Sequence, residues 1–259
     1  MRRRALLAGL LLAGLVVVFA LPHPDPTTVD LTSTLAGASP QHPLGTDHLG
    51  RDLWGLLATG FWRTATVVAV TCTTAVAVGV PLGLAAGYLG RGVDAVVMTV
   101  TDLTLIVPSF VAALIITSAV GLTPTSAGLV LGVFGSGTYV TQTRALTRAV
   151  RHADYVRAET LFGTSTPAVL GRFVLPAVAD PLLRYFGATA SGAVLSYAGL
   201  SFIGLGIDST IPDWGTMLYQ YRSHLDHPRL VLWPSLGILV LAVAFQLLCD
   251  SSVSRSHDD

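Results

Sequence analysis

The sequence predicts an all-α fold, a polytopic membrane helical bundle with six transmembrane helices and both termini in the cytoplasm. Three observations carry this prediction: a composition poor in charge, six long apolar runs, and a concentration of arginines in every second segment between those runs. Of the 259 residues, 52% are hydrophobic and 12% are charged, and the mean hydropathy is +0.66. Soluble domains carry about 25% charged residues, so the composition indicates an integral membrane protein.

A helix needs about 20 mostly apolar residues to cross a bilayer. The first candidate run follows Arg2, Arg3 and Arg4, as the apolar core of a secretory signal peptide would. Because this run is long for a signal peptide and no clean A-x-A cleavage site follows it, we interpret it as a retained helix. The six candidate crossings are residues 5–21, 64–89, 95–119, 125–142, 182–205 and 230–249.

The arginines set the predicted orientation. All 15 basic residues are arginines, and the cytoplasmic loops of membrane proteins are enriched in Lys and Arg. With the N-terminus inside, the inner segments hold eleven arginines and the outer segments hold four. The predicted organisation is a first helix with an extracytoplasmic segment (1–62), a core (63–250) containing a cytoplasmic loop (142–181), and a short cytoplasmic tail (251–259).

A stripe of glycines runs along the second predicted crossing. Gly79, Gly83 and Gly87 recur every four residues, which places them on one helix face, and small residues in that pattern allow membrane helices to pack closely. We expect leucine at Gly83 to impair assembly, and leucine at Gly90, in a predicted loop, to be milder. Pro81 lies in the same crossing and Pro108 in the third, where each can kink its helix.

Two further groups are weighed as candidate sites. Asp102 is an acid inside the third predicted crossing, a position that is costly for a charge, but it lies near the cytoplasmic end and a structural role is favoured over proton coupling. Trp214, in the outer turn "PDWG", lies near the predicted outer interface together with Trp233, Tyr219 and Tyr221. Amphipathic rings are favoured at that interface, which explains these aromatic residues without substrate contact.

The predicted cytoplasmic loop contains a compact polar segment, "DYVRAETLFGTSTPAVLGRFVLP", residues 154–176. Its pattern predicts a short helix over 154–162 ended by Gly163 as a C′ glycine. Thr166 then acts as an N-cap before Pro167, and a second short helix ends at Pro176. Two short helices joined by a tight turn form a knob suited to docking on another protein. The alternative is an amphipathic loop on the bilayer surface.

This segment resembles the EAA loop of ABC-importer permeases, whose pattern is E-A-A, three residues, G, nine residues and I-x-L-P. The glycine-to-LP spacing matches from Gly163 to Leu175 and Pro176, whereas the triplet reads Arg157-Ala158-Glu159 and matches only at Ala158. The resemblance implies an ATPase-coupling loop that contains Asp154, Tyr155, Arg157, Ala158, Glu159, Gly163, Leu175 and Pro176.

Three other blocks resemble one subfamily of these permeases, the second permease subunit of dipeptide, oligopeptide and nickel importers. They are "HPLGTDHLGRD" (42–52), "AGYLGRGVD" (86–94) and "LSFIGLGIDSTIPDWGTML" (200–218). With the EAA-like loop they follow the family's order and cover the chain from His42 to about Asp250. Departures are the altered triplet, Ala177 where the family often has asparagine, and a short N-terminus.

The resemblance implies a type I ABC-importer transmembrane fold in the bacterial cytoplasmic (inner) membrane, in contact with lipid. The implied partners are a sister permease in a heterodimer, two ATP-binding subunits and an extracytoplasmic substrate-binding protein. The chain has no P-loop GxxxxGK[ST], so ATP hydrolysis is expected on partner chains and no cofactor is expected here. The expected cargo is a di- or oligopeptide, with nickel or a metal chelate as the alternative. The zero net charge gives no indication of nucleic-acid binding.

Two other classes are distant alternatives. An intramembrane protease needs a G-x-S-x-G serine or H-E-x-x-H, and neither pattern occurs. A secondary transporter would normally carry several charges inside its crossings. His224 and His227 form an HxxH in an outer loop, but surface histidines are far commoner than metal sites. Cys72 and Cys249 lie in different apolar runs and have no metal or redox spacing.

Overall fold

The computed structural model describes residues 2–204 and 211–253, with side chains for 6–204 and 211–248. Residues 205–210 of the third subfamily block, the side chain of Cys249 and the end of the predicted tail lie outside the described residues. Within the described ranges the chain is helical apart from the loop over residues 20–52, which holds one isolated bridge between Thr46 and Asp52, and the shorter connections between helices. The elements are α1 (Arg2–Phe19), α2 (Leu53–Leu89), α3 (Arg91–Ile106), α4 (Ser109–Val120), α5 (Pro124–Val150), α6 (Asp154–Leu161), α7 (Thr166–Val169), the π-helical turn η1 (Leu170–Val174), α8 (Leu175–Ile203), α9 (Trp214–Tyr221) and α10 (Pro228–Val253).

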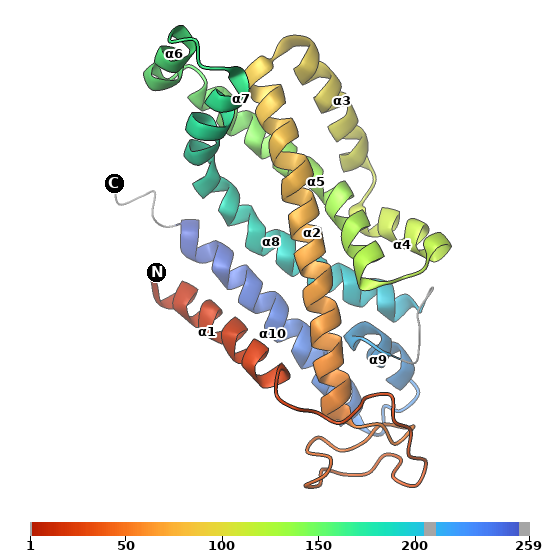
Figure 1. Cartoon of the computed structure of the whole chain (residues 1–259). Coiled ribbons are helices and arrows are strands. Elements are labelled where there is room, and N and C mark those ends of the chain that lie inside the picture. The colour runs from red at the N-terminus through yellow and green to blue at the C-terminus, as the bar shows by residue number, and fades with distance from the viewer. Residues whose placement is uncertain (1, 205–210, 254–259) are drawn as a thin grey trace.

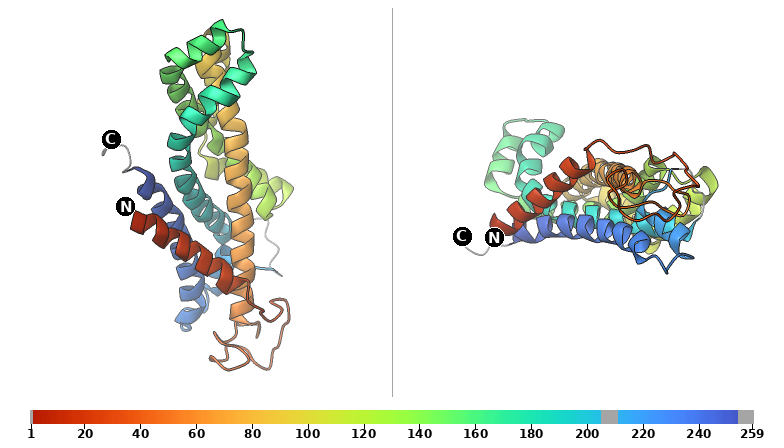
Figure 2. Two further views of the ribbon diagram at one scale, coloured as in Figure 1. Left: turned by 60° about the vertical axis from the view of Figure 1, so that its left-hand side comes forward. Right: turned by 90° about the horizontal axis from the view of Figure 1, so that it is seen from below.

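The long helices form an elongated bundle with distinct ends (Figure 1). α2 extends along the bundle and packs most extensively on α5. α8 packs on α10, and α10 also packs on α1. α1 lies beside α10 and crosses it at an angle (Figure 2). At one end, here called the α6 end, α6 lies near the turn between α2 and α3 (Figure 1). The opposite, α9 end holds α9 and the loop over residues 20–52.

The glycine stripe of α2 lies against α5 of the same chain. A Cβ atom built on Gly83 would lie 2.6 Å from the Cβ of Thr143 and 2.7 Å from the carbonyl oxygen of Val140. Gly79 and Gly87 make equally close approaches to α5. These distances are shorter than ordinary carbon contacts of about 3.5–4.0 Å, so only glycine lets the two helices pack this closely.

α2 and α5 run parallel. A Cβ on Gly128, near the start of α5, would lie 2.7 Å from the Cβ of Val70 at the middle of α2, and a Cβ on Gly87, near the end of α2, would lie 2.6 Å from the Cβ of Thr147 near the end of α5. Positions about 58 to 60 residues apart therefore stay opposite one another along the contact. Because two parallel helices need a return between them, α3 and α4 must carry the chain back.

The return through α3 and α4 is broken, which corrects the expectation of one continuous crossing over 95–119. The two helices meet at an angle of 78°, across an extended Val107 (ψ 114°) and Pro108. Proline disfavours the helical conformation of the residue before it, so Pro108 ends α3 rather than kinking it.

Not every predicted crossing is long and apolar enough to span a membrane by itself. In the described part of the chain three helices are, Leu53–Leu89, Thr166–Ile203 and Pro228–Leu248, and the bent pair of α3 and α4 would make a fourth. Leu6–Phe19 is a shorter apolar helix. The count of six crossings stays a prediction.

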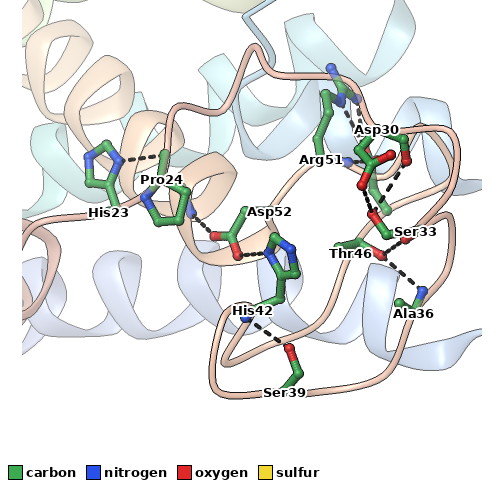
Figure 3. Close-up of polar contacts among 12 residues, drawn as sticks. His23, Pro24, Asp30, Ser33, Ala36, Ser39, His42, Thr46, Arg51 and Asp52 are labelled. Carbon is green, nitrogen blue, oxygen red and sulfur yellow. Dashed lines mark hydrogen bonds and ion pairs between the residues drawn. The ribbon is translucent and has the colours of Figure 1, made fainter.

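α2 begins at Leu53, eleven residues before the predicted crossing at 64. The Asp52 carboxylate accepts a hydrogen bond from the Gly55 backbone N–H at 2.8 Å, and such N-caps typically stabilise a helix by about 1 kcal/mol. The same carboxylate lies 2.8 Å from Nδ1 of His42 (Figure 3). The first subfamily block thus caps α2 and fastens the loop to it.

Trp214 lies in the core instead of at a membrane interface, which corrects the sequence interpretation. It is 1% exposed, its Nε1 donates to the Leu57 carbonyl at 3.0 Å, and its ring covers Gly60 of α2 and Gly237 of α10. A Cβ on Gly60 would lie 2.5 Å from the ring. The "PDWG" turn therefore joins α9 to two long helices at the α9 end.

Candidate functional site

The knob is residues 154–176, at the α6 end of the bundle (Figure 1). A turn at 151–153 separates α6 from α5, and Asp154 supplies an acid to the first turn of α6, which complements the positive end of the helix dipole. Val156 anchors α6 because it is 1% exposed and belongs to an apolar cluster with Leu84 of α2 and Val174 of η1. Its burial fixes which face of α6 points outward.

Gly163 ends α6 in the left-handed conformation predicted from the sequence, with φ at +81°. The Thr164 N–H donates to the Glu159 carbonyl at 3.1 Å, and the Gly163 N–H donates to the Thr160 carbonyl at 3.1 Å. This pair of bonds is the Schellman motif. The turn therefore depends on backbone geometry that glycine adopts at low cost.

Glu159 stabilises that turn with its side chain. The Thr164 hydroxyl donates to a carboxylate oxygen of Glu159 at 2.9 Å, and the side chain of Glu159 is half-buried. Charge alone would place Glu159, like Arg157, in solvent or at the rim of a contact. Arg157 is exposed and Ala158 is half-buried, so the two charged residues of the triplet have different surroundings.

The knob presents apolar side chains to its surroundings. Leu161 is 87% exposed and Phe162 is 83% exposed, and Tyr155 is 48% exposed. Apolar residues packed at helical spacing usually face a core, and Val156 does so. Leu161 and Phe162 instead stand at the end of α6, directly before the rigid Gly163 turn, where a protein partner could bury them.

The second short helix of the knob is continuous with α8, which corrects two sequence predictions. Ser165 rather than Thr166 occupies the N-cap position, and it makes no capping hydrogen bond through its side chain. Pro176 does not stop a helix: α7, η1 and α8 form one helical run from Thr166 to Ile203. Leu175 and Pro176 directly follow the π-helical turn η1, so the missing proline N–H falls where the hydrogen bonding of the run departs from a regular α-helix.

A groove of about 500 Å³ lies beside α6. It is lined by Tyr88 at the end of α2, by Arg151 and His152 of the turn after α5, and by three residues of α6. Arg151 is held there because Nη1 donates to the Gly87 carbonyl at 3.1 Å. The groove therefore joins the knob to the ends of the paired helices α2 and α5, with Arg157 on its edge.

Asp94, Arg144 and Arg148 form an ion cluster that was not recognised in the sequence. Asp94, in the first turn of α3, pairs with Arg144 and Arg148 on α5. Nη2 of Arg144 donates at 2.9 Å and Nη2 of Arg148 at 2.6 Å. The sequence does contain a signal for this cluster. Asp94 is the last residue of the block "AGYLGRGVD", and Arg144 and Arg148 are four residues apart, on one helix face. Asp102 is exposed on α3.

The α9 end carries a second polar cluster, built from the block at 42–52. The Asp47 carboxylate accepts from Arg51 at 2.8 Å and from the Tyr221 hydroxyl at 3.3 Å. Burial raises the pKa of Tyr221 well above its usual value, and Asp47 adds to that effect. The His48 ring lies 5.0 Å from the His224 ring, centroid to centroid. Burial lowers the pKa of His48 below its usual 6.5.

Thr46 closes the same loop. Its hydroxyl donates to the Ser33 carbonyl at 2.5 Å and accepts from the Ala36 N–H at 2.9 Å (Figure 3). Thr46, Asp47, Arg51 and Asp52 are all buried. The first subfamily block is therefore a structural unit that holds the loop over residues 20–52 onto α2 and α9.

Known proteins similar to this chain are membrane components of transport systems. The family described as binding-protein-dependent transport system inner membrane component matches residues 79–256. Among curated relatives, the probable D,D-dipeptide transport system permease protein DdpC of Escherichia coli K12 is 32% identical over 239 residues, covering 91% of this chain and 80% of that protein. The nickel transport system permease protein NikC of the same strain is 29% identical over 255 residues, covering 98% and 91%.

A third relative and a solved structure agree. The dipeptide transport system permease protein DppC of Haemophilus influenzae is 29% identical, covering 96% of this chain and 88% of that protein. An inward-facing structure of the MetNI methionine ABC transporter shares the fold, with a TM-score of 0.56 and 17% identity over 77% of this chain and 97% of that chain. The chain therefore belongs to the family of binding-protein-dependent transport system inner membrane components, and it is an ABC-importer permease of the peptide and nickel subfamily, located in the bacterial inner membrane.

Proposed function

We propose that the chain imports di- or oligopeptides as one half of a permease heterodimer, driven by two separate ATP-binding subunits and supplied by an extracytoplasmic binding protein. The named relatives include permeases for dipeptides and for nickel. Nickel or a metal chelate therefore remains the second candidate cargo. The similarity of the chain to membrane components of transport systems supports a non-catalytic role, with ATP hydrolysis on the partner chains.

The proposed topology has six crossings and puts both termini and the α6 end in the cytoplasm. α1, α2, the bent pair of α3 and α4, α5, α8 and α10 alternate in direction if each crosses once. The last turns of α5, the turn that follows it and the knob carry Arg144, Arg148, Arg151, Arg157 and Arg172. Arginine in short loops favours the cytoplasmic side, and the ATP-binding subunits would meet the knob there.

The observation that carries this proposal is the pair of almost fully exposed apolar side chains on a rigid knob. Val156 fixes α6 to the bundle, and the Gly163 turn fixes the direction of the chain after it. Leu161 and Phe162 are left outside. Burying such a side chain in a partner contributes about 1.5–3 kcal/mol, so the two residues can dominate a docking contact. Closure of the ATPase pair would then move the knob, and with it the continuous rod of α7, η1 and α8.

The experiment replaces each residue by serine, Leu161→Ser and Phe162→Ser, in the full-length chain expressed with its sister permease and ATPases. The matched control is Leu225→Ser, because Leu225 is 68% exposed but belongs to the α9 end. We expect both knob variants to insert normally and to lose ATPase copurification, while the control retains it. Equal ATPase recovery from all three variants would contradict the docking role of the knob.

A further inference from the structure

A polar recess lies at the middle of the bundle, between α2, α4, α5 and α8. Its volume is about 270 Å³. Thr71 lies at the midpoint of α2, and Thr138 and Thr189 lie at the midpoints of α5 and α8 within one residue. At 1.5 Å of rise per residue, Thr71 is roughly 27 Å from either end of its helix. The recess therefore lies far from both aqueous ends of the bundle.

The recess displays hydroxyl groups that the protein leaves free. Ser109, Thr138 and Ser196 line it, and none of the three hydroxyls bonds to another residue in the described part of the chain. Serine and threonine in helices often donate to a carbonyl of the preceding turn, as Thr66 does to Trp62 at 2.9 Å. A free hydroxyl in hydrocarbon is unfavourable, so these three need water or a solute.

Two glycines keep the recess open. A Cβ on Gly135 of α5 or on Gly192 of α8 would meet no atom within 4 Å. These glycines differ from those of the α2 stripe, where a Cβ would collide with α5. Their lack of a side chain therefore serves no helix contact within this chain, and it leaves space beside the free hydroxyls.

We propose that this recess is the chain's share of the transport pathway and that it accepts small zwitterionic solutes, such as unmodified short peptides, through uncharged hydrogen bonds. The inference rests on the proposed function. A hydroxyl both donates and accepts, so the same side chains serve an ammonium group and a carboxylate. Among the described lining residues the one ionisable side chain is the phenol of Tyr185.

The alternative cargo fits the lining less well. Divalent nickel is held in proteins by imidazole, thiolate and carboxylate ligands, and the described lining of the recess contains none of these groups. Ligand pockets usually have about 300–1,000 Å³, so 270 Å³ is too small for a complete peptide site. Thr138 and Gly192 are exposed at its opening, where a sister permease would complete it.

Cysteine labelling tests the recess without knowledge of the natural cargo. Gly192→Cys and Ser196→Cys are made in full-length chain lacking Cys72 and Cys249, and each is reconstituted with the sister permease. The control is Leu195→Cys, which lies between them in sequence, is 55% exposed and does not line the recess. The probes are membrane-impermeant cationic and anionic methanethiosulfonates, with rates corrected for their reactivity toward a free thiol.

We expect both reagents to label positions 192 and 196 at rates within about three-fold of each other, because a charged lining would favour one sign by about ten-fold or more. Position 195 should react at least about ten-fold more slowly, because the thiolate is the reactive form and apolar surroundings suppress it. Labelling of 195 as fast as 192, no labelling of 192 and 196, or a ten-fold preference for one sign would overturn the inference.

A filling variant separates this inference from the coupling role of the knob. Gly192→Leu should abolish uptake of alanyl-alanine while ATPase copurification and binding-protein-stimulated ATP hydrolysis continue. Gly14→Leu is the matched control, because Gly14 is also an exposed helical glycine with no atom within 4 Å of a built Cβ. Unchanged uptake in Gly192→Leu, or uptake of nickel chloride but not alanyl-alanine by the unsubstituted complex, would overturn the inference. Failure of the coupling proposal would instead appear as unchanged ATPase recovery in Leu161→Ser and Phe162→Ser, with the labelling pattern at positions 192, 195 and 196 intact.

Discussion

Replacing Gly83 by leucine should destabilise the chain by itself, before any partner is involved. A Cβ at this position would lie 2.6 Å from the Thr143 Cβ and 2.7 Å from the Val140 carbonyl oxygen. Ordinary carbon contacts are about 3.5–4.0 Å, so α2 and α5 must separate by about 1 Å. Part of the obstacle is backbone, which cannot rotate away. From the sequence alone we expected the defect in assembly, and the structure assigns it to a contact within the chain.

Overpacking of this kind typically costs about 1–3 kcal/mol. Leucine also adds three carbon atoms beyond Cβ, which puts the expected cost near the upper value, about 3 kcal/mol. In a domain of this size 1 kcal/mol shifts the unfolding midpoint by about 2–4 °C, so the midpoint should fall by about 6–12 °C. The assay is thermal unfolding of the purified full-length chain in detergent, followed by tryptophan fluorescence.

Gly92→Leu is the appropriate control for this measurement. A Cβ on Gly92 meets no atom within 4 Å, and the residue is exposed in the first turn of α3. Leucine is a better helix former than glycine by about 0.8–1 kcal/mol, so the midpoint should stay or rise. Gly90 is unsuitable, because its φ of +64° strains any L-residue, against the sequence expectation of a mild effect there. Equal midpoints for Gly83→Leu and Gly92→Leu would refute the packing argument.

Two further predictions concern the polar clusters at the two ends. Asp94→Asn removes the partner shared by Arg144 and Arg148, so the unfolding midpoint should fall, and by less in 0.5 M than in 0.05 M salt because salt screens such pairs; the same loss at both salt concentrations would contradict an ionic role. His48 has its pKa lowered from 6.5, mainly by burial, with His224 and Arg51 acting in the same direction and Asp47 opposing them. The unfolded chain then binds more protons than the folded one just below pH 6.5, so stability should fall as the pH drops through that range. His48→Gln should reduce this fall in the unfolding midpoint. A pH profile in that variant equal to that of the unsubstituted chain would argue against the role of His48.

The long apolar helices were predictable because burial in a bilayer demands apolar side chains over about 20 residues. The residues at which these helices begin and end were harder to predict. α2 begins at Leu53 because Asp52 caps it, a local signal that a hydropathy pattern does not contain. The break at Pro108 interrupts a run that stays apolar on both sides, so composition continued through it. Trp214 was misplaced because its burial depends on Gly60 and Gly237, which are far from it in sequence.

The knob was predictable where a residue has one conformational role. The sequence predicted Gly163 as the C′ glycine of α6, and its φ in the structure is +81°. Pro176 misled the prediction because a proline usually ends a helix, whereas here the π-helical turn η1 directly before it lets the helical run continue into α8. The half-buried setting of Glu159 depends on Thr164 across the turn, so its charge alone pointed to solvent.

If the shape of the knob couples this chain to its ATPases, binding-protein-stimulated ATP hydrolysis by the complex should depend on the turn at Gly163, which Gly163→Val disturbs. The left-handed conformation costs an L-residue about 1–2 kcal/mol, a factor of about 5–30 in the population of the correct turn. The matched control is Gly171→Val, in the same knob, where a Cβ meets no atom within 4 Å and φ is not positive. We expect both variants to insert normally and only Gly163→Val to lose stimulated hydrolysis. Full stimulated hydrolysis in Gly163→Val would contradict a coupling role for the shape of the knob.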